Sequence, residues 1–179
     1  MKDISIKKAK KILIVGGCGA GKSTFSLKLG NATGIEVHHL DKYFWKPGWI
    51  ESEKSEWNIK VDELLSKDEW IIEGNFKGSF RRRAMCADRI FMFDLPTNKL
   101  LGGIIKRYLN GKFTNVKRVD MTEGCDEHLD IEFIRFVLTF NKKVRPVMYE
   151  ILEDIKFDNH NLVIFKSRVE ADNYLRGHR

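Results

Sequence analysis

Short apolar runs alternate with longer stretches of helical spacing along this chain. The apolar runs are four to six residues long: Lys11–Val15, Glu36–Leu40, Glu69–Glu73, Arg89–Asp94 and Leu162–Phe165. Runs of this length, rich in branched and aromatic side chains, are typical of strands in a parallel sheet that is covered on both faces. The pattern therefore predicts five parallel strands.

Between these runs, apolar residues recur every three or four positions, which predicts helices. In Ser52–Lys67 the residues Trp57, Val61 and Leu64 fall on one face, and Ser52 is a candidate N-cap. Further helices are expected over Ser23–Thr33, Asn98–Leu109, Ile131–Phe140, Val144–Phe157 (with Pro146 in its first turn) and Val169–Leu175. Alternating strands and helices predict an α/β fold, doubly wound with right-handed crossovers, whose ligands collect at the carboxyl ends of the strands.

Length and composition favour one ordered domain. The 179 residues fit a single domain over 1–179, and a content of 42% hydrophobic and 32% charged residues argues against long disorder. No apolar run approaches membrane-spanning length, and the basic N-terminus lacks the apolar core of a signal peptide. The three cysteines are widely spaced and form no C-x-x-C motif, so we expect reduced thiols in a cytoplasmic protein.

The most specific chemical signal is a glycine-rich loop between the first strand and the first helix. It consists of Gly16, Gly17, Cys18, Gly19, Ala20, Gly21, Lys22, Ser23 and Thr24, which complete the P-loop pattern G-x-x-x-x-G-K-S. Backbone N–H groups of such a loop form an anion nest at a helix N-terminus. Lys22 then reaches the β- and γ-phosphates, and the Ser23 hydroxyl ligates Mg²⁺. The motif predicts a nucleoside triphosphate, ATP in the leading hypothesis, and Mg²⁺.

Carboxylates follow several of the other predicted strands at the same sheet edge. Asp41, after the second strand, is placed to hold Mg²⁺-bound water or to accept a proton from a substrate hydroxyl, or to cap a turn. Glu73, which ends the third strand, is a candidate for metal support, and Gly74 would let a substrate pass close to the backbone. Asp94 precedes a Leu-Pro pair, which favours a structural strand-to-helix turn.

An aromatic run and a group of arginines complete the candidate acceptor side. The run Tyr43–Trp49 includes Trp45, which could stack on a flat substrate or pack under the following helix. Three consecutive arginines, Arg81–Arg83, cannot all face one way on a helix. One of them, for which we take Arg81, is expected to reach an anionic substrate.

The segment 110–130 is long, polar and charged, and it predicts a lid. Arginines flank it or lie within it, and guanidinium groups stabilise the charge that spreads over a transferring phosphoryl group. For each of these arginines, an exposed surface position remains an equal alternative.

The formal net charge of +7 suits polyphosphate ligands and also nonspecific nucleic-acid binding. The basic residues are scattered rather than gathered in one tail. This favours local anion sites, with a basic patch assembled by folding as the alternative.

Several segments together resemble a known family. His39–Lys42, Trp45–Trp49, Trp70–Phe76 and Glu123–Cys125, combined with the P-loop, resemble the FlaR-related DNA topology modulation proteins, which are adenylate-kinase-like P-loop proteins. The likeness spans roughly residues 10–175. It implies a nucleotide-kinase-like P-loop NTPase fold, a three-layer α/β/α arrangement with a five-stranded parallel sheet of order 2-3-1-4-5 and a helical lid insert.

The resemblance also implies roles for individual residues. Asp41 would hold the phosphoryl acceptor, and Arg107 and Arg118 would clamp phosphates from the lid region. Arg168 would belong to the loop that contacts adenine. Related kinases often have Asp-Gly where this chain has Glu73-Gly74, which makes metal support by Glu73 less direct.

Two functions follow from these observations. The leading hypothesis is an ATP-dependent, Mg²⁺-assisted phosphotransferase acting on a small molecule, nucleotide or nucleoside. The alternative is a nucleotide-gated DNA-binding protein that modulates DNA topology, although the sequence holds no helix-turn-helix, zinc-finger or aromatic RNA-binding signature. No membrane partner is expected.

Overall fold

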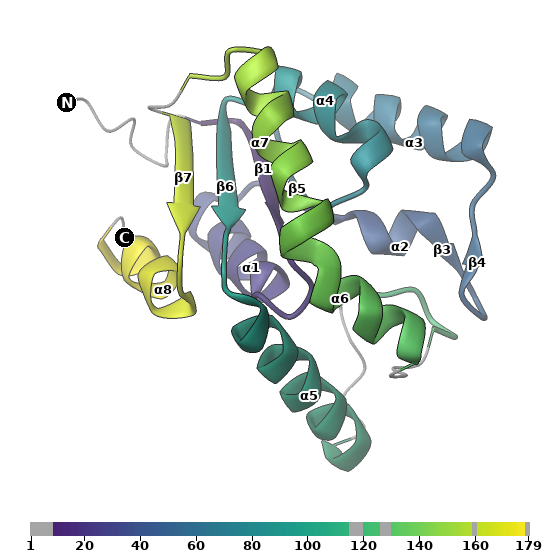
Figure 1. Cartoon of the computed structure of the whole chain (residues 1–179). Helices are drawn as coiled ribbons and strands as arrows, with labels where there is room; N and C mark the ends of the chain where they lie inside the picture. Colours follow the sequence, from purple (N-terminus) through teal and green to yellow (C-terminus); the bar gives the residue numbers. More distant parts are fainter. Residues whose placement is uncertain (1–8, 115–119, 126–129, 159–160, 178–179) are drawn as a thin grey trace.

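The computed structural model describes residues 9–114, 120–125, 130–158 and 161–177 (Figure 1). In chain order the elements are β1 (Lys11–Gly16), α1 (Lys22–Thr33), β2 (Val37–His39), α2 (Leu40–Phe44), β3 (Trp45–Lys46), β4 (Ile50–Glu51), α3 (Lys54–Ser66), β5 (Trp70–Glu73), α4 (Lys77–Cys86), β6 (Arg89–Phe93), α5 (Thr97–Thr114), α6 (Ile131–Lys143), α7 (Arg145–Asp154), β7 (Leu162–Phe165) and α8 (Arg168–Gly177).

Five parallel strands form the central sheet in the order β2-β5-β1-β6-β7. Counted among these five strands alone, the order reads 2-3-1-4-5, and the labels differ only because a separate hairpin takes the numbers β3 and β4. The sheet lies between helices, with α1 and α8 on one face and α4 and α7 on the other (Figure 1). The predicted three-layer α/β/α class is therefore confirmed.

The middle strands of the sheet are buried because both faces of the sheet are covered, and most of their residues are apolar. The residues of β6 are all buried, and so are those of β1 after its first residue. Phe25 of α1 packs its ring edge-on against Phe91, Phe93 and Phe165, with ring centroids 5.0, 5.4 and 5.3 Å away. This aromatic cluster fixes the first turn of α1 against the sheet, directly behind the P-loop.

The structure differs from the sequence expectations around the second strand. Strand β2 ends at His39, and the predicted last strand residue, Leu40, begins the short helix α2. The hairpin β3–β4, in which Trp45 pairs with Glu51, was not predicted. Ser52 is not the N-cap of α3. Its hydroxyl donates instead to the Phe44 carbonyl oxygen at 2.7 Å, with the Tyr43 carbonyl oxygen 3.1 Å away, and the helix begins at Lys54.

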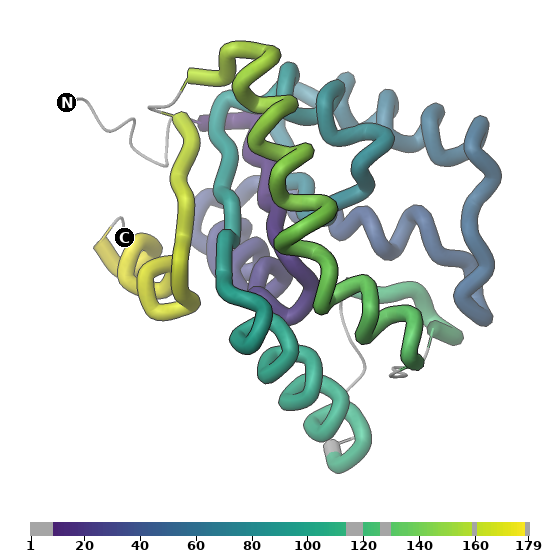
Figure 2. Tube along the Cα trace, viewed as in Figure 1, coloured from purple at the N-terminus to yellow at the C-terminus, as the bar shows by residue number. Residues whose placement is uncertain are grey.

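The long helix α5 continues beyond the carboxyl ends of the strands and projects from the sheet (Figure 2). It runs to Thr114, five residues past the predicted end at Leu109, and so takes in the beginning of the expected lid segment 110–130. Residues 115–119, including Arg118, and residues 126–129 lie outside the described residues, so the lid remains a prediction. Among the helices described, none is long and apolar enough to cross a membrane.

Candidate functional site

The P-loop is held in its curled shape by close contacts with β6 and α5. Gly16 has φ 135°, and a Cβ there would lie 2.4 Å from the carbonyl oxygen of Phe93. On the opposite side, a Cβ on Gly103 of α5 would lie 2.1 Å from the carbonyl oxygen of Gly19. Helix α1 begins at Lys22, immediately after the loop, and Gly21 has no side chain to cap it. The arrangement leaves a helix N-terminus facing the loop, as anion binding requires.

Lys22 and Ser23 meet the buried carboxylate of Glu73 at the end of β5. The Lys22 Nζ lies 3.6 Å from Glu73 Oε1 and donates to the Gly17 carbonyl oxygen at 3.2 Å. The Ser23 Oγ lies 3.2 Å from Glu73 Oε2 and 2.6 Å from Asp120 Oδ2. A hydroxyl has one proton, so it cannot donate to both carboxylates at once. One serine oxygen and two carboxylates therefore converge beside the phosphate loop.

Glu73 is ionised despite its burial. It is 4% exposed, and burial alone would raise its pKa. The Lys22 ammonium and the hydrogen bond with His39 outweigh this and hold the pKa of Glu73 below its ordinary value. The Nδ1 of His39 lies 3.0 Å from Glu73 Oε2. The site thus holds a fixed negative charge within reach of the P-loop lysine and serine.

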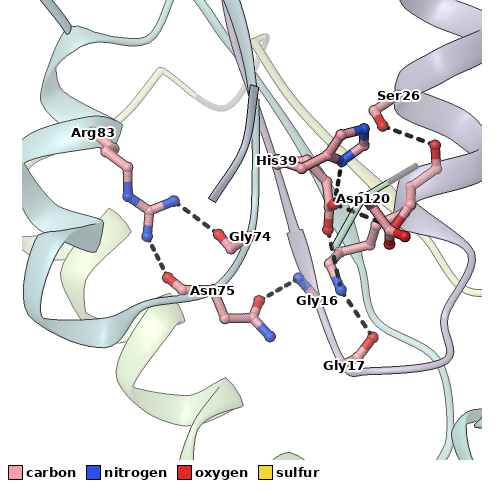
Figure 3. A network of polar contacts seen from close by, with 11 residues as sticks. Gly16, Gly17, Ser26, His39, Gly74, Asn75, Arg83 and Asp120 are labelled. Atoms are coloured by element: carbon pink, nitrogen blue, oxygen red, sulfur yellow. Dashed lines mark hydrogen bonds and ion pairs between the residues drawn. The ribbon is translucent and has the colours of Figure 1, made fainter. Parts of the chain in front are cut away.

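Hydrogen bonds from Arg83 hold the backbone that follows Glu73 at the end of β5. This arginine of α4 is fully buried and donates to the carbonyl oxygens of Gly74 at 2.8 Å, Asn75 and Phe76 at 3.1 Å (Figure 3). Burial lowers the pKa of Arg83 to about 9, so the guanidinium stays charged at neutral pH. The Asn75 Oδ1 accepts a hydrogen bond from the Gly16 N–H at 3.0 Å. Arg83 therefore supports the P-loop through the β5 strand end.

A cavity of about 790 Å³ opens in front of this group. Of the predicted site residues, the cavity wall includes Cys18, Gly19, Gly21, Lys22, Ser23, Thr24, Asp41, Glu73, Arg107 and Arg168. Arg168 donates to the carbonyl oxygens of Gly19 and Lys99, at 2.6 and 2.9 Å, and so joins the P-loop to α5. The structure thus brings the P-loop, the residue after β2 and two predicted arginines to one cavity.

The Cys18 thiol lines the same cavity but is not activated. Burial raises its pKa above the ordinary value, and the nearby Lys22 ammonium offsets this only in part. The thiol therefore stays protonated at neutral pH, which favours a small side chain accommodated in the loop over a nucleophile.

Three predicted substrate residues do not reach the cavity wall. Arg81 forms an ion pair with Asp154 of α7 and lines a separate surface pocket. Arg83, two positions later on the same helix, is the arginine that is buried in the core. Gly74, with φ 140°, serves close packing, since a Cβ there would lie 2.9 Å from Leu40 Cβ. Trp45 packs edge-on against Phe44 and Trp49, with ring centroids 5.0 and 5.4 Å away. These three residues therefore lie outside the cavity wall, and a role for them in substrate binding stays a prediction.

The structure also adds residues that the sequence reasoning missed. His39 and Asn75 contact the site from strand ends, so the rule that placed Asp41 and Glu73 there could have found them. Asp120 is 7% exposed and lies 97 positions along the chain from its partner Ser23. No local sequence pattern signals that contact. Lys106 and Asn110 of α5 also line the cavity.

The segment Asp120–Cys125 joins the P-loop to the hairpin β3–β4. At one end Asp120 accepts from Ser23. Further along, Thr122 Oγ1 donates to the Lys42 carbonyl oxygen at 3.0 Å, and Gly48 N–H donates to the Gly124 carbonyl oxygen at 3.0 Å. One short stretch of backbone therefore connects the P-loop to α2 and to the hairpin.

Comparison with known proteins supports the fold. Neither a protein-family profile nor a curated protein matched the sequence. Among solved structures, a gluconokinase from Sinorhizobium meliloti 1021 is similar, with a TM-score of 0.53 at 13% sequence identity over 94% of this chain and 89% of that chain. At this identity the likeness shows the fold alone. This chain accordingly has a P-loop kinase-like fold.

Proposed function

We propose that the protein is an ATP-dependent phosphotransferase that uses Mg²⁺ and acts on a small molecule, nucleotide or nucleoside. The observation that carries the proposal is the convergence of Lys22, Ser23 and the buried Glu73 on one cavity that also contains Asp41 and Arg107. A donor site and a candidate acceptor group share this cavity. The kinase-like fold supports the same class of activity.

On the donor side, the P-loop N–H groups and the Lys22 ammonium bind the triphosphate, and Arg168 borders the base. Ser23, Glu73 and Asp120 present the hard oxygen atoms that Mg²⁺ prefers, and Mg²⁺ keeps several waters when it is bound by few protein groups. When bound, the ion would neutralise charge that develops on the transferring phosphoryl group.

On the acceptor side, Asp41 orients the acceptor hydroxyl and takes its proton. It lies in the first turn of α2 and lines the cavity. Arg107 lines the cavity from α5 and would stabilise the negative charge of the equatorial oxygens during transfer. We further propose that segment 110–130, with Arg118, covers the site as a lid.

The test is phosphoryl transfer from radiolabelled ATP across a panel of nucleosides, nucleoside monophosphates and gluconate, which is the substrate class named for the similar structure. The wild type should label one class, and Lys22→Met should lose nucleotide binding. Asp41→Asn should keep ATP binding but lose transfer by about 100-fold or more.

The matched control is Arg81→Ala, which removes a charge outside the cavity and should leave transfer unchanged. Each variant is checked for native circular dichroism before it is assayed. A wild type that binds ATP and Mg²⁺ yet labels no acceptor would contradict the proposal. Full transfer by Asp41→Asn would remove Asp41 from it.

The DNA-binding alternative draws on the net charge of +7. It requires duplex affinity that falls steeply with salt and that depends on bound nucleotide. Affinity no stronger than that of a nonspecific basic protein of equal charge would exclude it.

A further inference from the structure

His39 is a buried titratable residue without a role in the function proposed above. It is the last residue of β2, is 5% exposed, and pairs in the parallel register with Glu73 of β5. Parallel pairing sets the two side chains next to each other on one face of the sheet, where Nδ1 lies 3.0 Å from Glu73 Oε2 (Figure 3).

The partners of His39 define its tautomer. Glu73 is a carboxylate and only accepts, so the proton of this hydrogen bond sits on Nδ1 of His39. The Nε2 atom is buried and has no hydrogen-bond partner among the residues described. A proton there would be a buried donor without an acceptor. These contacts therefore place a proton on Nδ1.

This bond controls which way Glu73 faces. Oε2 lies 3.0 Å from His39 Nδ1 and 3.2 Å from Ser23 Oγ, while Oε1 stays 3.6 Å from Lys22 Nζ. That separation is longer than a charged hydrogen bond of about 2.8 Å. If the carboxylate moved from this looser ion pair to direct hydrogen-bond distance of Lys22, it would compete with the phosphates for the ammonium.

We propose that His39 is a positioning residue that anchors Glu73 toward Ser23 and keeps it from closing onto Lys22. The proposal rests on the proposed function, in which Lys22 and Ser23 hold the triphosphate and its Mg²⁺. Groups that support metal-site carboxylates in this way are worth about 10- to 100-fold in affinity.

The experiment compares two substitutions of His39. Asn has an amide nitrogen close to the place of Nδ1 and keeps the donor, whereas His39→Leu removes it at similar volume. The control is His38→Leu on the same strand, since His38 is also buried but contacts Tyr43 and Lys67 instead of Glu73. Binding of a fluorescent ATP analogue is titrated over a range of Mg²⁺ concentrations.

We expect His39→Leu to weaken Mg²⁺-dependent nucleotide binding about tenfold or more. His39→Asn and His38→Leu should stay within about threefold of the wild type, which corresponds to well under 1 kcal/mol. A leucine variant that binds like the wild type, or an asparagine variant as weak as the leucine one, would overturn the proposal.

A second measurement needs no variant. The ¹⁵N chemical shifts of the His39 ring in the wild-type protein report which nitrogen carries the proton, and a proton on Nε2 alone would also overturn the proposal. If the wild type binds no nucleotide under any condition, the proposed function fails, and the nitrogen shifts still decide whether His39 donates to Glu73.

Discussion

Replacing Lys22 by methionine should destabilise the fold as well as the nucleotide site. Methionine keeps the length and most of the volume of the side chain but removes the ammonium that lies 3.6 Å from Glu73 Oε1. Both side chains are almost fully buried, at 9% and 5% exposed. Glu73 would then be a buried carboxylate whose nearest positive charge has gone.

The expected magnitude follows from that distance. Two unit charges 3.6 Å apart attract each other by about 4 to 5 kcal/mol at an effective dielectric constant of about 20. The variant also no longer bears the desolvation cost of burying the Lys22 charge, which offsets part of this loss. Removing one partner of a buried pair typically costs about 3 to 5 kcal/mol. We expect a loss of about 3 kcal/mol in the free energy of unfolding at pH 7, because His39 still donates to Glu73.

The assay is urea unfolding followed by circular dichroism for Lys22→Met, Glu73→Gln and the double variant. The double variant should recover at least about 1 kcal/mol relative to the sum of the single changes. Lys28→Met is the control, since its ion pair with Asp172 is shorter, at 2.6 Å, but about half exposed. It should change stability by less than about 1 kcal/mol. Strictly additive effects of Lys22→Met and Glu73→Gln would refute the reasoning.

Three further predictions test other parts of the structure. Hydrogen bonds from Lys166, Arg145 and Tyr149 outweigh the effect of burial and hold the pKa of Asp94 below its ordinary value. The folded state therefore binds fewer protons than the unfolded chain, so the wild type loses stability as the pH falls below about 4. Asp94→Asn should lower the free energy of unfolding at pH 7 and make it depend less on pH in the acid range, as followed by circular dichroism. An acid unfolding transition with the same midpoint and slope as that of the wild type would contradict the role of Asp94. Gly103→Ala should weaken binding of a fluorescent ATP analogue about tenfold, because a methyl group there meets the Gly19 carbonyl oxygen. The control Gly102→Ala places a methyl group with nothing within 4 Å and should be neutral. Equal affinities of the two variants would be evidence against close packing of α5 on the loop. Arg81→Ala should change the free energy of unfolding by less than about 1 kcal/mol, because its ion pair with Asp154 is half exposed, and a larger loss would show that the pair is structural.

The sheet could be predicted from the sequence because burial on both faces leaves a strong local signal. Leu162–Phe165 has the predicted bounds, and β1, β5 and β6 differ from theirs by one residue. The P-loop is equally local, since its pattern lies within one strand–loop–helix unit. Helix α4 was harder to predict because only a few of its residues are apolar, and Phe80 and Ala84 are the buried ones among them.

The remaining site residues depend on how the chain turns in three dimensions. Arg81 and Arg83 differ by two positions, about 200° of helical rotation, and this rotation sends one to the surface and the other into the core. Asp120 lies 2.6 Å from Ser23 although the two are 97 positions apart in the sequence. Neither outcome has a signature in the local sequence, whereas Lys22, Asp41 and Arg107, which could be singled out from the sequence, all line the cavity.

The connection through Asp120–Cys125 has a thermodynamic consequence. Its two ends are hydrogen-bonded to Ser23 and to the backbone around Lys42 and Gly48, and the stretch between them is too short to absorb a large shift. Any ligand whose binding displaces Asp120 must therefore alter the free energy of the hairpin contacts. Linkage makes this effect reciprocal, so a change in the hairpin contacts alters affinity at Ser23 by the same free energy.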